Sequence, residues 1–208
     1  MCSIIGSFNK DTVVALCELN AYRGQHSHSI SYYNTISNEF DQIIRKLGPI
    51  NYDDINPEDS EYIIVHMQAP TTDAKDNTSI HPAAIERDVL WHNGILKAKE
   101  IERLKDKYHI SSDWDTYILL KHMMSEGTPD NIDGTFSCLW YDSYRLYLFR
   151  NEISPMFIDS DMNISSTKFT NSEPTPPNSI LLFEPALKNV VPILHFNTVE
   201  NPYYFGDE

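Results

Sequence analysis

The run at residues 62–67, with the sequence YIIVHM, is the feature that most constrains the fold of this chain. Its β-branched residues and its continuous apolar character indicate a buried central strand of a sheet. Gln68 follows directly, and a polar loop with Thr71 and Thr72 comes after it. Because side chains at the end of a buried strand are well placed to line a cleft, this loop is a candidate site.

The rest of the chain alternates strand-like runs with helical spacing. Strands are predicted at residues 3–8, 30–36, 88–92, 135–141, 145–150, 156–164, 180–184 and 190–196. Helices are predicted at residues 12–21, 97–108 and 116–127. This pattern is typical of a mixed α+β domain in which one sheet packs on another.

The connections between these elements carry weaker signals. Residues 38–47 are expected to be helical or irregular, and residues 48–61 and 172–178 are expected to be surface connections. Asn93-Gly94 is a strong hairpin signal, but helical spacing follows it, so we expect a turn that joins a strand to a helix. Asp113 or Asp115 is expected to cap the third helix.

The acidic composition bears on partners and location. The chain has 16 Lys and Arg against 30 Asp and Glu, and its formal net charge of −14 disfavours binding to nucleic acid or anionic lipid. Its 208 residues suit one domain, expected at residues 2–197 with an acidic tail at 198–208. The sequence shows neither a bilayer-spanning apolar run nor a secretory signal, so we expect a cytoplasmic protein without membrane contact.

The metal-ligating residue types do not form a recognisable set. Cys2, Cys17 and Cys138 have neither metal-site spacing nor an even disulfide framework, and the last two are expected in the core. His26 and His28 lie two residues apart, but no second cluster completes a site, so a polar loop is the better interpretation. We therefore expect no metal and no other cofactor.

Cys2 is the candidate nucleophile. If Met1 is removed, Cys2 carries both a thiol and a free α-amine. The amine titrates near about 8 and the thiol near about 8.5, so the amine can act as a base for the thiol of its own residue. Position alone does not establish this role, because a cysteine after Met1 is common.

Several short motifs occur in an order that resembles the glutaminase domain of class II glutamine amidotransferases, which are N-terminal nucleophile hydrolases. The motifs are Cys2, Tyr22-Arg23-Gly24, the strand-end loop at residues 66–72, His92-Asn93-Gly94, Asp115-Thr116, and the later run at residues 148–151 with Ser154-Pro155. The resemblance covers nearly the whole chain. It implies a four-layer α/β/β/α sandwich of two mainly antiparallel sheets.

The resemblance also implies roles for individual residues. Cys2 would attack the side-chain amide of glutamine and form a γ-glutamyl thioester as ammonia leaves. Asn93 and Gly94 would stabilise the oxyanion, and Asp115, with Asp113 a less favoured neighbour, would bind the α-ammonium group of the substrate. A separate synthase subunit is the implied partner that accepts the ammonia.

One position departs from the family pattern. Many members have an arginine two residues after the strand-end histidine, where it binds the substrate α-carboxylate, but this chain has Gln68. Binding would then depend on Thr71, Thr72 and backbone donors, or on Arg23. Two alternatives therefore remain open: an N-terminal nucleophile hydrolase of another amide, and a binding or regulatory module without catalysis.

Overall fold

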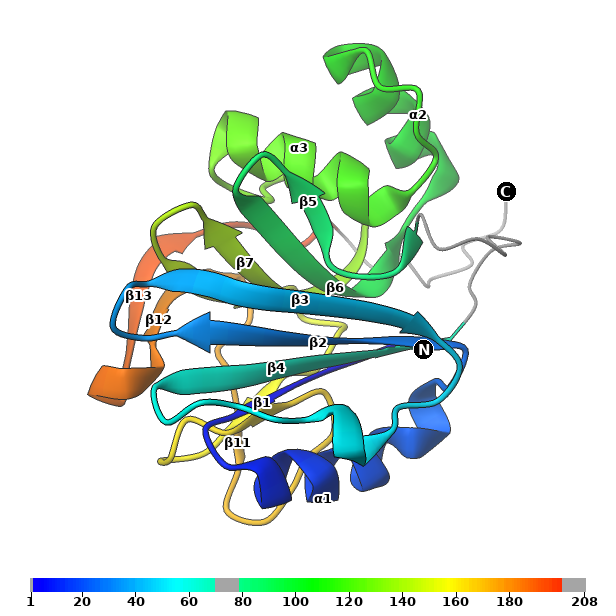
Figure 1. The fold of residues 1–208 in the computed structure, drawn as a ribbon. Coiled ribbons are helices and arrows are strands. Elements are labelled where there is room, and N and C mark those ends of the chain that lie inside the picture. The colour runs from blue at the N-terminus through cyan, green and yellow to red at the C-terminus, as the bar shows by residue number, and fades with distance from the viewer. Residues whose placement is uncertain (1, 70–78, 200–208) are drawn as a thin grey trace.

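The computed structural model describes residues 2–69 and 79–199 and contains two stacked sheets (Figure 1). The first sheet has the order β11-β9-β10-β1-β4-β2-β3, and the second has the order β13-β12-β8-β7-β6-β5. All strand pairs recorded in these described residues are antiparallel.

The elements of the two sheets come from separate parts of the chain. The first sheet consists of β1 (Ser3–Ser7), β2 (Ser27–Asn34), β3 (Glu39–Leu47), β4 (Glu61–Gln68), β9 (Phe157–Ile158), β10 (Ile164–Ser165) and β11 (Glu173–Pro174). The second sheet consists of β5 (Ala83–Ile85), β6 (Asp88–Leu96), β7 (Gly134–Asp142), β8 (Leu146–Arg150), β12 (Ser179–Glu184) and β13 (Asn189–His195). The helices are α1 (Lys10–Asn20), α2 (Ala98–Tyr108) and α3 (Asp115–Glu126), with short 3-10 turns η1 (Ala21–Arg23), η2 (Tyr52–Asp54) and η4 (Pro185–Leu187).

Three apolar cores define four layers, with α1 on one outer face and α2 and α3 on the other (Figure 1). Alternation along β1 separates the cores, because Ile4 packs between the sheets and Ile5 packs towards α1. Trp91 of β6 is fully buried in the core between the sheets. The predicted α/β/β/α sandwich of two mainly antiparallel sheets is therefore confirmed.

The predicted central strand is also confirmed, as β4 pairs with β1 on one side and with β2 on the other. Ile64 of β4 faces the core between the sheets, whereas Ile63 and Val65 face α1. The strand is buried on both faces, which explains why its apolar residues do not alternate with polar ones.

The prediction for residues 38–47 was wrong, because these residues form β3 at the edge of the first sheet. Phe40 and Ile43 pack against the core between the sheets, while Ile44 packs against the core beneath α1. A register shift opposite Tyr32 and Tyr33 interrupts the alternation that would have revealed the strand.

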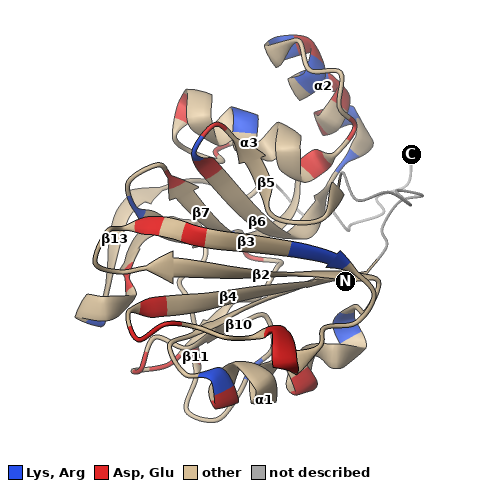
Figure 2. Ribbon diagram, in the orientation of Figure 1, with Lys and Arg blue, Asp and Glu red and all other residues tan. Residues whose placement is uncertain are grey.

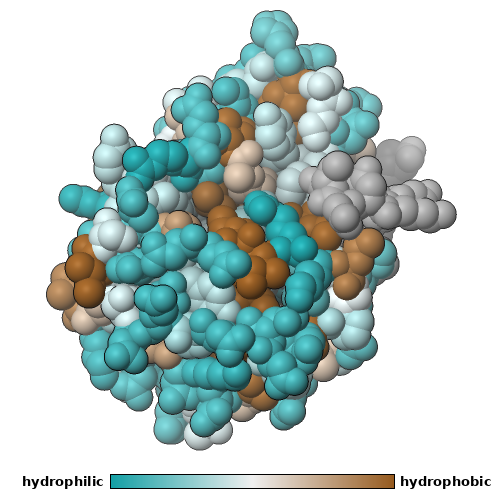
Figure 3. Space-filling model, viewed as in Figure 1, coloured by the Kyte–Doolittle hydropathy of each residue, from teal (hydrophilic) through white to brown (hydrophobic). Residues whose placement is uncertain are grey.

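On the face of the molecule seen in Figure 3, most side chains are hydrophilic, and a smaller hydrophobic group lies near the centre.

The prediction of a turn at Asn93-Gly94 was also wrong. Strand β6 continues through both residues to Leu96, with Asn93 opposite Ser137 and Gly94 opposite Phe136. A Cβ atom on Gly94 would lie 1.8 Å from the carbonyl oxygen of Thr135, so glycine is required for close approach of the backbones. The same residue type that favours tight turns here permits close strand packing.

The start of α3 differs in detail from the sequence prediction. Trp114 occupies the N-cap position without a side-chain hydrogen bond, so neither Asp113 nor Asp115 is the cap. Asp115 is instead the first helical residue, and the exposed Asp113 pairs with Lys105. By contrast, the side chain of Asn9 caps α1, accepting a hydrogen bond from the Thr12 N–H.

Residues 156–164 form two short strands, β9 and β10, in place of the single strand that was predicted. The Asp159 carboxylate accepts backbone hydrogen bonds from Asp161 and Asn163, which closes a turn between the strands. Strand β10 then pairs with β1. The predicted connection at 172–178 likewise contains the two-residue strand β11.

Charged residues are spread over several elements in the view of Figure 2. In the view of Figure 2, acidic residues lie on α1, α3 and several strands, and acidic and basic residues alternate along α2. Among the described helices, none is both long and apolar enough to cross a membrane.

Candidate functional site

Cys2 lies immediately before β1 and is buried, with 5% of its surface exposed. Its Sγ atom is 4.0 Å from the carbonyl oxygen of Ala69, at the end of β4. The Nε atom of Arg23 donates a hydrogen bond of 2.8 Å to the Cys2 carbonyl, and Arg23 is itself buried. Cys2 is thus fixed between the end of the central strand and the turn after α1.

Gly24 allows this turn to lie against the central strand. A Cβ atom there would lie 2.3 Å from the Ala69 nitrogen and 2.4 Å from the Gln68 carbonyl carbon. Its backbone is extended, so contact rather than backbone strain explains the glycine. A larger residue there would collide with the backbone at the end of β4.

Asn93 and Gly94 lie on β6 of the second sheet, and Asn93 is linked to β1 of the first. The Nδ2 atom of Asn93 donates to the Ser166 hydroxyl at 3.2 Å, and that hydroxyl also accepts from the Ile4 N–H at 3.0 Å. Ser166 therefore links the Asn93 amide to the strand that begins next to Cys2. Asn93 is 4% exposed, so its amide is held in a buried position.

Asp115 supplies the acidic group near the thiol. Its Oδ1 atom accepts from the Thr116 N–H at 2.7 Å, and its Oδ2 atom accepts from the Leu96 N–H at 3.3 Å. Its negative charge also contributes to raising the pKa of Cys2, although burial is the larger cause. A carboxylate is therefore held where it acts electrostatically on the thiol.

Gln68 is held by other protein groups at both ends of its side-chain amide. Its Oε1 atom lies 3.3 Å from the Ser27 hydroxyl and 3.1 Å from His81 Nδ1, and its Nε2 atom donates to the Ser79 carbonyl at 3.2 Å. These contacts fix the side chain against the segment that follows the central strand. Thr71 and Thr72 lie outside the described residues.

The electrostatic surroundings of Cys2 favour the neutral thiol in the chain as it stands. Burial raises the pKa of the thiol, the backbone contact with Ala69 lowers it, Asp115 raises it, and Arg23 lowers it. The net direction is upward.

Comparisons with known proteins agree with this arrangement of layers. No protein-family model and no curated protein matches the chain. Among solved structures, it matches a glutamine phosphoribosylpyrophosphate amidotransferase from B. subtilis, with a TM-score of 0.61 and 14% identity over 88% of this chain and 47% of that one. An allosteric regulatory enzyme of purine biosynthesis matches with a TM-score of 0.58 and 13% identity, over 88% of this chain and 46% of that one.

A third match is similar in length. The glutamine aminotransferase class-II domain protein from Silicibacter pomeroyi has a TM-score of 0.53 and 11% identity, with 94% of this chain and 98% of that chain covered. The chain has the fold of the class II glutamine amidotransferases. It spans about half the length of the first two structures. The resemblance predicted from the sequence is confirmed at the level of this fold.

Two buried groups of this site, His81 and Ser166, lie outside the motifs named from the sequence. His81 bonds both Gln68 and Thr116, Thr116 bonds the His92 ring, and Ser166 joins Asn93 to β1. His81 and Ser166 come from segments whose spacing carries no motif. Their positions become informative only once the two sheets are packed together.

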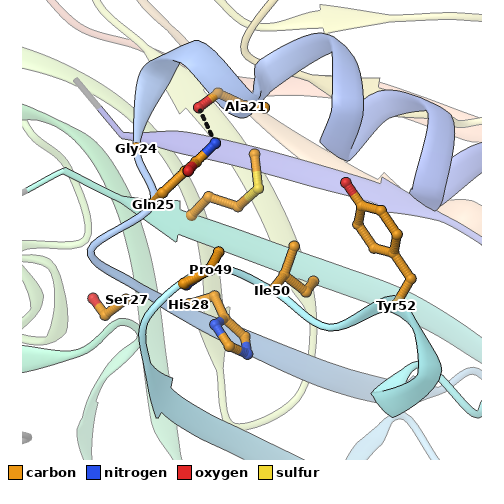
Figure 4. A pocket seen from close by; sticks show the side chains of 9 residues that line it. Ala21, Gly24, Gln25, Ser27, His28, Pro49, Ile50 and Tyr52 are labelled. Carbon is orange, nitrogen blue, oxygen red and sulfur yellow. Dashed lines mark hydrogen bonds between the residues drawn. The ribbon is translucent and has the colours of Figure 1, made fainter.

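The His26 and His28 pair does not enter the site. The Nδ1 atom of His28 contacts the Gly48 carbonyl at 2.9 Å, and no group of three metal-ligating side chains occurs among the described residues. His28 instead lines a cavity of about 60 Å³ behind the Gly24 turn (Figure 4). The other walls of this cavity include Ala21, Gln25 and Met67, and Gln25 donates to the Ala21 carbonyl. Such a volume suits one or two waters rather than a substrate.

Cys17 and Cys138 are buried, free thiols. Burial raises the pKa of Cys17 to about 12 and raises that of Cys138 well above its ordinary value. Both behave as small core residues.

Proposed function

We propose that this chain hydrolyses the side-chain amide of glutamine with Cys2 as nucleophile, after removal of Met1. The observation that supports this most strongly is that Arg23 bonds Cys2, Asp115 acts on the Cys2 thiol, and Asn93 is tied through Ser166 to the strand after Cys2, within the fold of the class II glutamine amidotransferases. Each of these residues comes from a different element. Together they supply the groups that amide hydrolysis requires.

The first step is attack by the thiolate. With Met1 removed, the α-amine of Cys2 takes the thiol proton directly or through water, and the sulfur adds to the amide carbon. The C–N bond then breaks, and the leaving nitrogen takes this proton and departs as ammonia. Water hydrolyses the resulting γ-glutamyl thioester, which releases glutamate and restores the thiol.

The oxyanion formed during attack needs fixed donors. We assign this role to the Asn93 side-chain amide and the Gly94 N–H, because Asn93 is buried and is linked through Ser166 to the strand after Cys2. Preorganised donors stabilise the transition state because they need no reorientation as charge develops. The absence of a Cβ atom on Gly94 keeps its backbone close to β7.

The other end of the substrate carries two charges. Asp115 binds the α-ammonium group in this proposal, and Arg23, Thr71 and Thr72 contribute to binding the α-carboxylate. Gln68 supports this subsite from behind, because its amide is bonded to Ser27, His81 and Ser79. The charge that an arginine would supply at this position is missing, which favours weak affinity for glutamine.

The neutral Gln68, whose amide is bonded at both its oxygen and its nitrogen, also favours a second candidate substrate. An amide without an α-carboxylate would not need the missing positive charge, while the nucleophile and oxyanion donors would serve it equally well. A panel of primary amides, followed by ammonia release, separates the two candidates. A higher kcat/KM for glutamine than for amides lacking the carboxylate supports the first.

A separate ammonia-consuming enzyme completes the proposal. Two of the matched structures are about twice the length covered by this chain, so the synthase function would reside in another polypeptide or another segment. Copurification from the native host followed by mass spectrometry identifies this partner. Recovery of the chain alone at every salt concentration argues against a stable partner.

The activity itself is tested with protein whose N-terminal residue is verified by mass spectrometry. We expect glutamate and ammonia from glutamine, no product from Cys2→Ala, and unchanged kcat in Cys17→Ala, which removes a core thiol distant from the site. A chain that retains Met1 should be inactive. Equal activity with and without Met1 would refute the role of the α-amine.

A further inference from the structure

A continuous series of hydrogen bonds crosses the site from one backbone carbonyl to another. We call it the histidine chain, and its members in order are the Ser79 carbonyl, Gln68, His81, Thr116, His92 and the Thr135 carbonyl. The five successive contacts measure 3.2, 3.1, 2.8, 3.2 and 3.2 Å. The series connects β4, β6, β7 and α3.

The protons available for the hydrogen bonds of the histidine chain can be counted. A neutral imidazole has one N–H for its two nitrogens, a hydroxyl has one O–H, and an amide accepts at one end while it donates at the other. Gln68, His81, Thr116 and His92 thus supply four protons along the chain for five contacts. Both ends are carbonyls, which only accept.

No rearrangement of the neutral groups removes this deficit. Rotating the Gln68 amide by half a turn or changing a histidine tautomer moves the unfilled contact to another place in the chain. If the Thr116 hydroxyl donates to the Asp115 carboxylate, 3.4 Å away, the deficit increases. His81, His92 and Thr116 are all buried, so two facing lone pairs among them would be strongly unfavourable, and a rotated Gln68 would set its amide oxygen against the Ser79 carbonyl at the 3.2 Å contact.

We propose that the histidine chain binds one additional proton, that the proton resides on His92, and that the resulting imidazolium positions the Asp115 carboxylate. Each of the five contacts then contains one proton between a donor and an acceptor. His92 donates from both nitrogens, to Thr116 and to the Thr135 carbonyl, and Thr116 donates to His81. His81 donates from Nδ1 to Gln68, and Gln68 donates to the Ser79 carbonyl.

The charged groups around the histidine chain favour His92 over His81 as the site of the added proton. The Arg45 guanidinium of β3 binds the carbonyls of Ile80 and Pro82, on both sides of His81. The His66 ring of β4 stacks on His81 with centroids 4.0 Å apart. Burial, together with these neighbours, lowers the pKa of His81 well below its ordinary value, and burial lowers the pKa of His66 to about 3.

The charged group nearest His92 is negative, in contrast to the guanidinium near His81. Its Nδ1 atom lies 3.9 Å from Asp115 Oδ2, on α3. The Cys138 thiol lies opposite His92 on β7, and burial raises its pKa well above the ordinary value, so it is uncharged at neutral pH. An imidazolium at His92 is therefore paired with a carboxylate, whereas one at His81 would lie beside a guanidinium.

His92 is a positioning residue in this account. Its charge holds Oδ2 of Asp115, while the Thr116 N–H holds Oδ1. The use of Asp115 to bind a substrate ammonium group rests on the proposed function. The proton count does not, because it depends only on the hydrogen bonds of the folded chain.

The test is long-range 1H–15N NMR of the full chain with 15N-labelled histidine rings, which distinguishes both tautomers and the imidazolium. Signals are assigned with His81→Gln and His92→Gln. At neutral pH we expect both His92 nitrogens to be protonated and His81 to carry its proton on Nδ1. A neutral His92 in the unsubstituted protein overturns the proposal, whatever the glutaminase assay gives.

The variant Gln68→Met tests the count itself. Removing the amide leaves three contacts for three protons, so His92 should become neutral and the proton of His81 should move from Nδ1 to Nε2. The matched control is Ser27→Ala, which removes a neighbouring bond to Gln68 but leaves the histidine chain intact, and there the imidazolium should persist. An imidazolium that persists in Gln68→Met, or that is lost in Ser27→Ala, overturns the proposal.

Discussion

Gly94→Ala is the substitution whose effect follows most directly from the fold. The new Cβ atom would lie 1.8 Å from the Thr135 carbonyl oxygen and 2.5 Å from its carbon. Reaching an ordinary contact distance requires the strands to separate by roughly 1.6 Å at this point. Both contacts are with backbone atoms in the middle of the second sheet, so no side-chain rotation relieves the overlap.

Overpacking of this kind costs about 1 to 3 kcal/mol, and a backbone clash belongs at the upper end, so we expect a loss of about 3 kcal/mol. For a chain of this length, that corresponds to a melting temperature lower by roughly 6 to 12 °C. Urea unfolding followed by circular dichroism measures the change. Activity towards glutamine should fall as well, because Asn93 and the Gly94 N–H move with the strand.

A second glycine provides the control. Gly48 has a φ of +86°, and a Cβ atom added there would have no neighbouring atom within 4 Å, so Gly48→Ala carries only a backbone cost of about 1 kcal/mol. If Gly94→Ala unfolds at the same urea concentration as Gly48→Ala, the close approach of β6 and β7 does not explain the glycine. The assignment of the Gly94 N–H to the oxyanion site would then lose its structural basis.

Three further predictions concern the site and the fold. In Asn93→Ala, kcat should fall about 10² to 10³-fold with little change in KM, because the amide acts on the developing oxyanion; an unchanged kcat would contradict this role. Asn9→Ala should lower the free energy of unfolding by about 1 kcal/mol, because it removes the cap of α1; no change in urea unfolding would count against the capping bond. In a chain that retains Met1, the raised pKa of Cys2 means that alkylation should be slow at neutral pH and accelerate only above pH about 9; rapid labelling at neutral pH would show that burial does not suppress the thiolate.

Much of the sandwich was predictable because strong local signals coincide with tertiary contacts. The run in β4 is apolar on both faces since it lies between α1 and the second sheet, and the cap at Asn9 marks α1 without reference to other elements. The same holds for α2 and α3, whose apolar residues join the core on the outer face of the second sheet. In these cases the residues that favour the local helix or strand are also the residues that the packing of the fold needs.

The errors occurred where a distant part of the chain determines the local structure. Edge strand β3 is held by pairing with β2, and its apolar residues divide between two cores after a register shift. Gly94 follows an asparagine, as in a hairpin, but the demand for glycine comes from Thr135, which is 41 positions away. No short window along the sequence contains both partners.

The candidate site shows the same division. Cys2, Arg23, Asn93 and Asp115 could be selected in advance from motifs in family order, and their roles remain proposals. His81 and Ser166 could not be selected, because a hydrogen bond between buried side chains depends on how the two sheets meet. The hydrogen bonds of Gln68 to Ser27 and His81 could not be predicted from the sequence either, because these partners lie on either side of Gln68 in the sequence.

The hydrogen bond from the Ile4 N–H to Ser166 spans 162 positions of sequence, and the bond from Arg23 to Cys2 spans 21. A site that depends on a contact across 162 positions is complete only after a long loop has closed. Partly folded chains would therefore carry a cysteine at the N-terminus without the oxyanion donors or the carboxylate beside it. Completion of folding itself would act as the activating event, and amide hydrolysis would report the fraction of chains that have reached the native topology.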